Sequence, residues 1–221
     1  MLSTHWFSTV KFSMNHTIFI ILVLSSFQGI SQQKTIRQIT SELENSPNPP
    51  LYVKDILKMK FRMDTVTVTS KDHFVGVEDS LAFYGKIKKV YGPYKGKVLL
   101  QILATIPTEF NHINQIFLDT SVFLKRFADS LANDIISRIY KGQSSFEDMA
   151  QSYSMGGEAS TNGDLGWMAR GSMVPAIEKE LAKSKKNELI KVWSKNGLHI
   201  IRKTGSPIQG TGYALIMRVY L

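Results

Sequence analysis

Residues 162–175 read NGDLGWMARGSMVP, and this stretch governs how the rest of the chain is interpreted. It is punctuated by glycines and ends on Pro175, and it shows little helical or strand periodicity. It nevertheless carries several large apolar side chains, among them those of Leu165, Trp167 and Met173. Apolar side chains exposed on a loop are costly, so we expect them either to cover the core beneath the loop or to form the wall of a binding site.

A strand and a long helix are predicted before this loop. Residues 113–119 (INQIFLD) form an apolar run typical of a strand, and Thr120 or Ser121 is suited to cap a helix that ends at Gly142. The helix would bury one stripe of apolar residues spaced by about four positions. The stripe consists of Phe123, Phe127, Leu131, Ile135 or Ile136, and Ile139.

Shorter elements complete this part of the chain. A serine at 144 or 145 can cap a second helix, and Pro175 suits the first position of a third. Two β runs around Asn196-Gly197 predict a type I′ hairpin, and residues 211–221 predict a closing strand. From residue 113 onward the pattern is therefore α+β, a small and mostly antiparallel sheet flanked by helices.

The preceding region has a different character. Residues 32–46 predict a short amphipathic helix, which the prolines at 47–50 would stop. Residues 51–106 are rich in β-branched and aromatic residues and are punctuated by Gly and Pro, so we expect three to five strands of a small, mainly β region. Nothing in this region has the spacing of metal ligands or of a nucleophile with its base, so we expect it to have a structural role in packing and positioning.

The N-terminus resembles a secretory signal. Residues 17–24 (TIFIILVL) are uncharged and apolar but too short to span a bilayer, and Gly29 and Ser31 are small residues suited to a cleavage site after 31. We therefore expect residues 1–31 to be a cleaved signal peptide and the protein to be periplasmic or otherwise extracytoplasmic. A buried strand or an uncleaved anchor is the alternative. The chain has no cysteine, so disulfides and a lipid on a cysteine are excluded.

Charge and motif spacing exclude several classes of function. The net charge is +9, but the basic residues are scattered and are not interleaved with aromatic ones, so we expect a solvated surface and no nucleic-acid partner. The histidines lack metal-ligand spacing, and Gly210 and Gly212 lack the context of a phosphate loop, so neither a metal nor a cofactor is expected. Ser154 and His199 lack the elbow motif of a hydrolase.

Three motifs in order resemble the parvulin peptidyl-prolyl isomerases. They are a helix of the type F-x-x-L-A-x-x-x-S, a loop of the type G-D-L-G-W followed by G-x-M-V-P-x-F, and a final G-x-H-I-I. The matching residues are Phe146, Ala150 and Ser154, then 163–167, Gly171, Met173 and Pro175, then Gly197, His199 and Ile200. The resemblance covers about 113–204 and implies a parvulin-like fold.

The resemblance also implies a shallow apolar pocket for a substrate proline ring. By position, its walls would be Leu165, Met173 and Ile177, where the family usually has Phe in place of Ile177. Leucine and methionine make adaptable apolar walls, and the alternative is that they only cover the core. Trp167 is expected to pack in the core or on the sheet, and Asp164 to form a turn by bonding to its own backbone.

The polar site of the family is only partly kept. His199 matches the histidine of the final hairpin, but the histidine of the first strand is replaced by Gln115, and the family's Cys or Asp position falls on Gly156. Gln115 can still donate and accept hydrogen bonds and so support the His199 ring. We reject His112 as a substitute, because a slip of three residues would invert the faces of the strand.

The resemblance implies an enzyme that isomerises X-Pro bonds of exported proteins during folding, with His199 and Gln115 as the catalytic pair. Its partners would be unfolded or extended proline-containing polypeptides, without a stable membrane span after signal cleavage. The alternative is a catalytically weakened chaperone or binding module for envelope protein assembly. The expected domains are an N-terminal helix with the β region (32–110), a parvulin-like domain (111–205) and a C-terminal strand (206–221).

Overall fold

The computed structural model describes residues 34–221, so the signal peptide predicted at 1–31 lies outside the described residues. The described residues fall into two units, with the division between Thr40 and Ser41. Helix α2 (Ile36–Asn45) confirms the helix predicted at 32–46. No helix within the described part of the chain is long and apolar enough to cross a membrane.

One antiparallel sheet organises the unit Ser41–Leu221. Its strand order is β1-β7-β3-β6-β5, and β2 and β4 each pair with β3. The strands are β1 (Phe61–Thr67), β2 (Val90–Tyr94), β3 (Val98–Asp119), β4 (Asp164–Ala169), β5 (Leu189–Trp193), β6 (Gly197–Lys203) and β7 (Ile208–Tyr220). The predicted α+β class with an antiparallel sheet is confirmed, and so is the closing strand.

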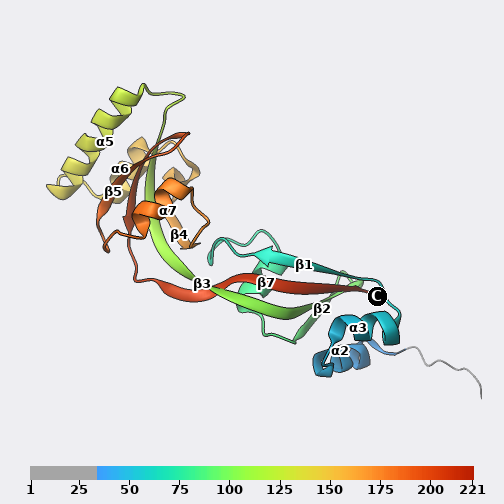
Figure 1. Cartoon of the computed structure of the whole chain (residues 1–221). Helices are drawn as coiled ribbons and strands as arrows, with labels where there is room; N and C mark the ends of the chain where they lie inside the picture. The colour runs from blue at the N-terminus through green and yellow to red at the C-terminus, as the bar shows by residue number, and fades with distance from the viewer. Residues whose placement is uncertain (1–33) are drawn as a thin grey trace, which may run out of the picture. The chain divides into compact units, whose positions relative to one another are not determined.

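Strand β3 connects the two parts of this sheet. Its residues 98–110 pair with β7, and the two strands run side by side in Figure 1. Its residues 113–119 pair with β6. The strand therefore passes residue 110, where the sequence predicts a boundary between 32–110 and 111–205, without a break in the pairing. The division into domains stays a prediction.

The prediction of three to five strands in 51–106 is confirmed at its lower limit, but the segment also contains helical elements that were not predicted. Three strands are present there, β1, β2 and the start of β3. The helical elements of the same region are α3 (Pro49–Leu51), the π-helical turn η1 (Tyr52–Leu57) and α4 (Val77–Tyr84). Helix α4 was missed because its aromatic residues suggest a strand, whereas Glu78 and Asp79 in its first turn favour a helix N-terminus.

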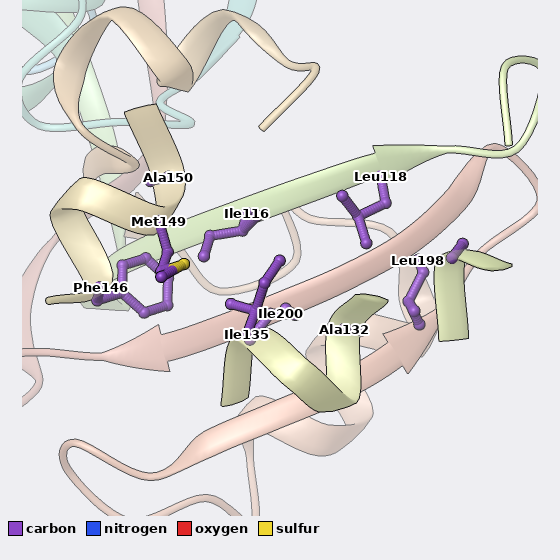
Figure 2. Close-up of a cluster of buried hydrophobic side chains, with 10 residues drawn as sticks. Ile116, Leu118, Ala132, Ile135, Phe146, Met149, Ala150, Leu198 and Ile200 are labelled. Atoms are coloured by element: carbon purple, nitrogen blue, oxygen red, sulfur yellow. The ribbon is translucent and has the colours of Figure 1, made fainter. Parts of the chain in front are cut away.

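Two helices cover one face of the sheet formed by β3 and β6. They are α5 (Lys125–Tyr140) and α6 (Phe146–Tyr153), and α6 begins with a capping box between Ser145 and Asp148. Figure 2 shows the core that they share with the two strands. This core consists of Ile116, Leu118, Ala128, Ala132, Ile135, Phe146, Met149, Ala150, Leu198 and Ile200.

The predicted start and buried face of α5 need correction. The helix begins at Lys125 after Leu124, without a side-chain cap, so Thr120 and Ser121 do not cap it. Its buried residues are Ala128, Ala132 and Ile135, whereas Phe127 is 53% exposed. Small alanines face the sheet because they allow the helix to approach it closely, and the larger residues of the stripe flank this contact.

The hairpin between β5 and β6 is present, but its turn differs from the prediction. A type I′ turn needs positive φ at both central residues, and neither Asn196 nor Gly197 has it. The N–H of Ser194 instead donates to the carbonyl of Gly197 at 2.8 Å, so the turn centres on residues 195 and 196. The stretch 162–175 also differs from expectation, because it contains strand β4 as well as loop.

The opposite face of β3 and β6 carries a second apolar cluster. Helix α7 (Pro175–Leu181) begins with proline at its first position, as predicted, and buries Ile177 and Leu181. These two side chains cluster with Ile113, Val192 and Ile201 of the sheet. The two faces of β3 and β6 therefore carry separate clusters, and the second one lies next to the predicted binding residues.

At Gly163 the loop approaches strand β3 closely. The φ of Gly163 is +85°, its carbonyl accepts the N–H of Gln115 at 2.7 Å, and a Cβ would lie 2.7 Å from Cβ of Ala150 and 2.9 Å from the Gln115 carbonyl. We expect Gly163→Ala to lower the free energy of unfolding by about 2–6 kcal/mol, because backbone strain of about 1–3 kcal/mol adds to an overpacking cost of similar size. Urea denaturation measures this change.

Gly142→Ala is the matched control. Gly142 also has a positive φ, 65°, but a Cβ there would meet nothing within 4 Å. The Gly142→Ala variant should therefore lose stability through backbone strain only, without an overpacking cost. Equal losses of stability in the two variants would contradict the close approach of Gly163 to β3.

Candidate active site

Strand alternation places His199 and Gln115 on the same face of the sheet. Leu198 and Ile200 point toward α5 and α6, so His199 and Ile201 point the other way. In β3, Ile116 faces the helices and Gln115 does not. Because Gln115 pairs with Ile201 in the antiparallel register, its side chain is a diagonal neighbour of His199.

The two side chains are in hydrogen-bonding contact. His199 Nδ1 lies 3.1 Å from Gln115 Oε1, and His199 Nε2 lies 2.8 Å from Ser194 Oγ. Both nitrogens of the imidazole are therefore occupied by protein partners. The structure brings the predicted pair together, and their catalytic role stays a prediction.

Burial controls the charge of the imidazole. His199 is 8% exposed, and its ring lies 4.8 Å from the ring of Phe117, centroid to centroid. Desolvation lowers the pKa of His199 below its usual value, and the negative charge of Glu158 opposes this shift without cancelling it. The ring is therefore neutral near pH 7.

Glu158 is a member of the site that sequence reasoning missed. It lies in the short 3-10 helix η2 (Gly157–Thr161) and is 8% exposed. Its Oε1 accepts hydrogen bonds from Gln115 Nε2 at 3.2 Å and from Ser154 Oγ at 2.7 Å. The available signal was the Gly-Gly-Glu sequence at 156–158, where two residues without side chains precede an acid.

The predicted apolar residues adjoin the second cluster. Leu165 of β4 and Met173 of the following loop are half-buried and pack against the cluster that contains Ile113, Val192 and Ile201. Ile177 belongs to that cluster and is only 1% exposed, so it supports the wall from beneath rather than offering surface itself. The structure thus brings the three predicted residues together, and Leu165 and Met173 are the two that are partly exposed.

Two other predicted roles can be compared with contacts. Trp167 packs against a different core cluster, which confirms that it is a packing residue. Asp164 Oδ1 accepts the N–H of Gly166 at 2.8 Å, as expected of a turn residue. His112 projects from β3 with parity opposite to Gln115, and its Nδ1 lies 2.6 Å from Thr204 Oγ1.

The loop that carries Met173 is held by an acid of helix α7. Glu178 Oε1 accepts the N–H of Gly171 at 2.8 Å and the N–H of Met173 at 3.0 Å. The carboxylate therefore fixes the backbone on both sides of residue 172. The sequence offered one signal for it, an acidic residue in the first turn after Pro175.

Within residues 34–221 no three His, Cys, Asp or Glu side chains gather in a way that could hold a metal ion. The site offers a polar array that runs from the half-buried Ser194 through the buried His199 and Gln115 to Glu158, on the sheet face that also carries Leu165 and Met173. Such an arrangement can seat an apolar group and orient a polar one.

Comparison with known proteins agrees with the motifs. Residues 99–206 match the family model described as the PPIC-type PPIase domain. The chain is 30% identical over 156 residues to the foldase protein PrsA of Bacillus subtilis (69% of this chain, 44% of that protein). It is 33% identical over 93 residues to the chaperone SurA of Bordetella avium (41% of this chain, 18% of that protein). The chain spans less than half the length of these relatives.

Solved structures are also similar over part of the chain. The crystal structure of a PpiC-type peptidyl-prolyl cis-trans isomerase domain is 26% identical, with a TM-score of 0.44. The similarity covers 47% of this chain and 94% of that one.

The buried, neutral His199 predicts a pH dependence of stability. In the unfolded chain, His199 binds a proton near pH 6.5, whereas in the folded chain the same imidazole is protonated only at lower pH. The free energy of unfolding should therefore fall as the pH drops below about 6.5 and through the lowered folded pKa. Urea unfolding of wild type and His199→Gln across pH 5–8 measures this, with the exposed His73→Gln as control. The same slope in wild type and His199→Gln would contradict the assignment.

The anchoring of the Met173 loop gives another prediction. Glu178→Ala removes the acceptor of two N–H groups, so the amides of residues 171 and 173 should lose protection from hydrogen exchange. Glu180→Ala, on the same helix and paired only with Lys183 in the described contacts, is the control. Unchanged protection at both amides in Glu178→Ala would rule out the anchor.

Proposed function

Because residues 99–206 form a PPIC-type PPIase domain, we propose that this chain is a peptidyl-prolyl cis–trans isomerase acting on X-Pro bonds of exported proteins during their folding. The relatives are a foldase and a chaperone, which supports a role in protein folding. One observation carries the proposal. The hydrogen-bonded pair His199 and Gln115 lies on the same sheet face as the half-buried Leu165 and Met173.

Isomerisation makes modest chemical demands. The barrier to rotation about a peptide bond is about 18–20 kcal/mol, and no covalent bond forms or breaks. The enzyme therefore needs only to bind the twisted amide more tightly than the planar one, and each 1.4 kcal/mol of such preference is about tenfold in rate.

The two kinds of side chain would divide this task. Leu165 and Met173 would hold the prolyl ring through apolar burial, at about 25 cal/mol per Å². The polar array would act on the peptide group that precedes the ring. A twisted amide has lost its resonance and is less polar at its carbonyl, so surroundings poor in water favour it over the planar form.

We also propose where the protein works and what each region of the chain contributes. Residues 1–31 would direct export and be removed, and the mature chain would work outside the cytoplasm. Residues 111–205 would carry the isomerase activity, with 32–110 and 206–221 completing the sheet beside it. Strand β3 would link the two regions, because it runs from the first into the second.

A second candidate function is a chaperone or binding module without turnover. Gln115 replaces a histidine of the family pattern, and Gly156 replaces its Cys or Asp. A domain altered in this way can keep its partly exposed apolar side chains, Leu165 and Met173, and still bind unfolded chains. The surface of the N-terminal β region would then be the place where partners dock.

Kinetics of X-Pro peptides separate the two functions. We expect the chain to accelerate cis-to-trans relaxation with saturation, and Met173→Ala to lower kcat/KM about tenfold, equivalent to about 1.4 kcal/mol of transition-state binding. Met63→Ala makes the same change at an exposed site on β1 and should leave the rate unchanged. No acceleration by wild type, together with suppressed aggregation of an unfolded client, would favour the binding module.

A further inference from the structure

Gly156 and Glu158 form one structural feature. An ideal Cβ on Gly156 would lie 2.6 Å from Cδ of Glu158, so the carboxylate fills the space that a side chain at 156 would occupy. The φ of Gly156 is −91°, so the glycine leaves room for this carboxylate and is not needed for the backbone conformation. The acid that is missing at position 156 is thus replaced by one that reaches back from position 158.

The carboxylate is held firmly in this place. Ser154 donates its hydroxyl to Glu158 Oε1 at 2.7 Å, and the same hydroxyl oxygen accepts the N–H of Phe117 at 2.9 Å. The backbone is fixed too, because the carbonyl of Glu158 accepts the N–H of Gly163 at 2.7 Å. Glu158 is therefore tied to β3 through Ser154 and to the loop through Gly163.

The direction of each hydrogen bond follows from this carboxylate. An ionised carboxylate only accepts, so the NH₂ group of Gln115 must face Glu158. The other end of the amide, Oε1, then faces His199 and also only accepts, so His199 Nδ1 must carry the proton. Nε2 is left unprotonated and accepts the hydroxyl of Ser194.

We propose that Glu158 is a positioning residue that fixes the Nδ1–H tautomer of His199 through the amide of Gln115. This inference rests on the proposed function only for its catalytic meaning, since the tautomer itself can be measured without substrate. In that function, His199 would act as a neutral, immobile ring whose two nitrogens are both satisfied by protein, and it would not exchange protons with the peptide. An isomerase needs no proton transfer, so such a ring is sufficient.

Imidazole NMR of the full chain tests the proposal. In the chain labelled with ¹⁵N-histidine, long-range ¹H–¹⁵N correlations at pH 7.5 should show a protonated Nδ1 and an unprotonated Nε2 for His199. In Glu158→Ala, the Gln115 amide is free to turn, and the ring should shift toward the Nε2–H form that free imidazole side chains favour in water. Glu158→Gln, which keeps the shape, should give a mixture because its amide can donate or accept.

A rescue variant separates this role from simple destabilisation. Gly156→Asp combined with Glu158→Ala returns a carboxylate to the same space from the neighbouring backbone position, and we expect it to restore the Nδ1–H tautomer. Glu180→Gln, an exposed change outside the array, is the control and should leave the tautomer as in wild type.

Three results would overturn the proposal: an Nε2–H tautomer in wild type, an unchanged tautomer in both Glu158 variants, or no recovery in the folded double variant. The wild-type spectrum decides the first point even where a variant does not fold. If the tautomers behave as expected but wild type does not accelerate X-Pro relaxation, the proposed function fails and the positioning role of Glu158 stands.

Discussion

The antiparallel register between β3 and β6 is the constraint on which the site depends. Because side chains alternate along a strand, a slip of one residue would move Gln115 into the helix-covered core and separate it from His199. The register is enforced by burial on both sides. Ile116 and Ile200 are fully buried beneath the helices α5 and α6, and Ile113 and Ile201 are buried in the cluster beneath α7.

The polar array persists inside this packing because its members satisfy one another. A buried polar group without a partner costs about 1–3 kcal/mol, and a partly satisfied network is worse than an apolar one. Here both imidazole nitrogens of His199 have partners, and Glu158 accepts from both Gln115 and Ser154. The array is therefore rigid, and rigidity is what a site needs when it works by favouring one geometry of a bound amide over another.

Local patterns in the sequence predicted the order of elements around this site well. The motifs at 146–154, 163–175 and 197–200 located α6, the Met173 loop and β6, and the strand at 113–119 lies where the apolar run indicated. The meeting of Gln115 with His199 could be anticipated because strand alternation and a hairpin leave few arrangements. These elements could be predicted because each is determined by a short segment whose pattern of apolar and polar residues matches its structure in the fold.

Features that depend on space between distant segments could not be predicted. Helix α4 was read as a strand, because composition outweighed the weak capping signal. The sequence predicted that α5 buries Phe127, but the helix buries Ala128 instead. Close packing against the sheet decides which side of the helix faces inward. Glu158 was missed for the same kind of reason, since its position depends on a volume that only the folded chain creates beside Gly156.

The most direct test of the account is to locate a bound proline on the molecule. Exchange NMR of a short X-Pro peptide, with the full chain at catalytic concentration, reports cis–trans interconversion, and the amide spectrum of the labelled chain reports where the peptide binds. The account predicts exchange peaks between the two isomers, with shift changes centred on Leu165, Met173 and the strand around His199. Exchange that is absent, or shift changes confined to residues outside this face, would contradict it.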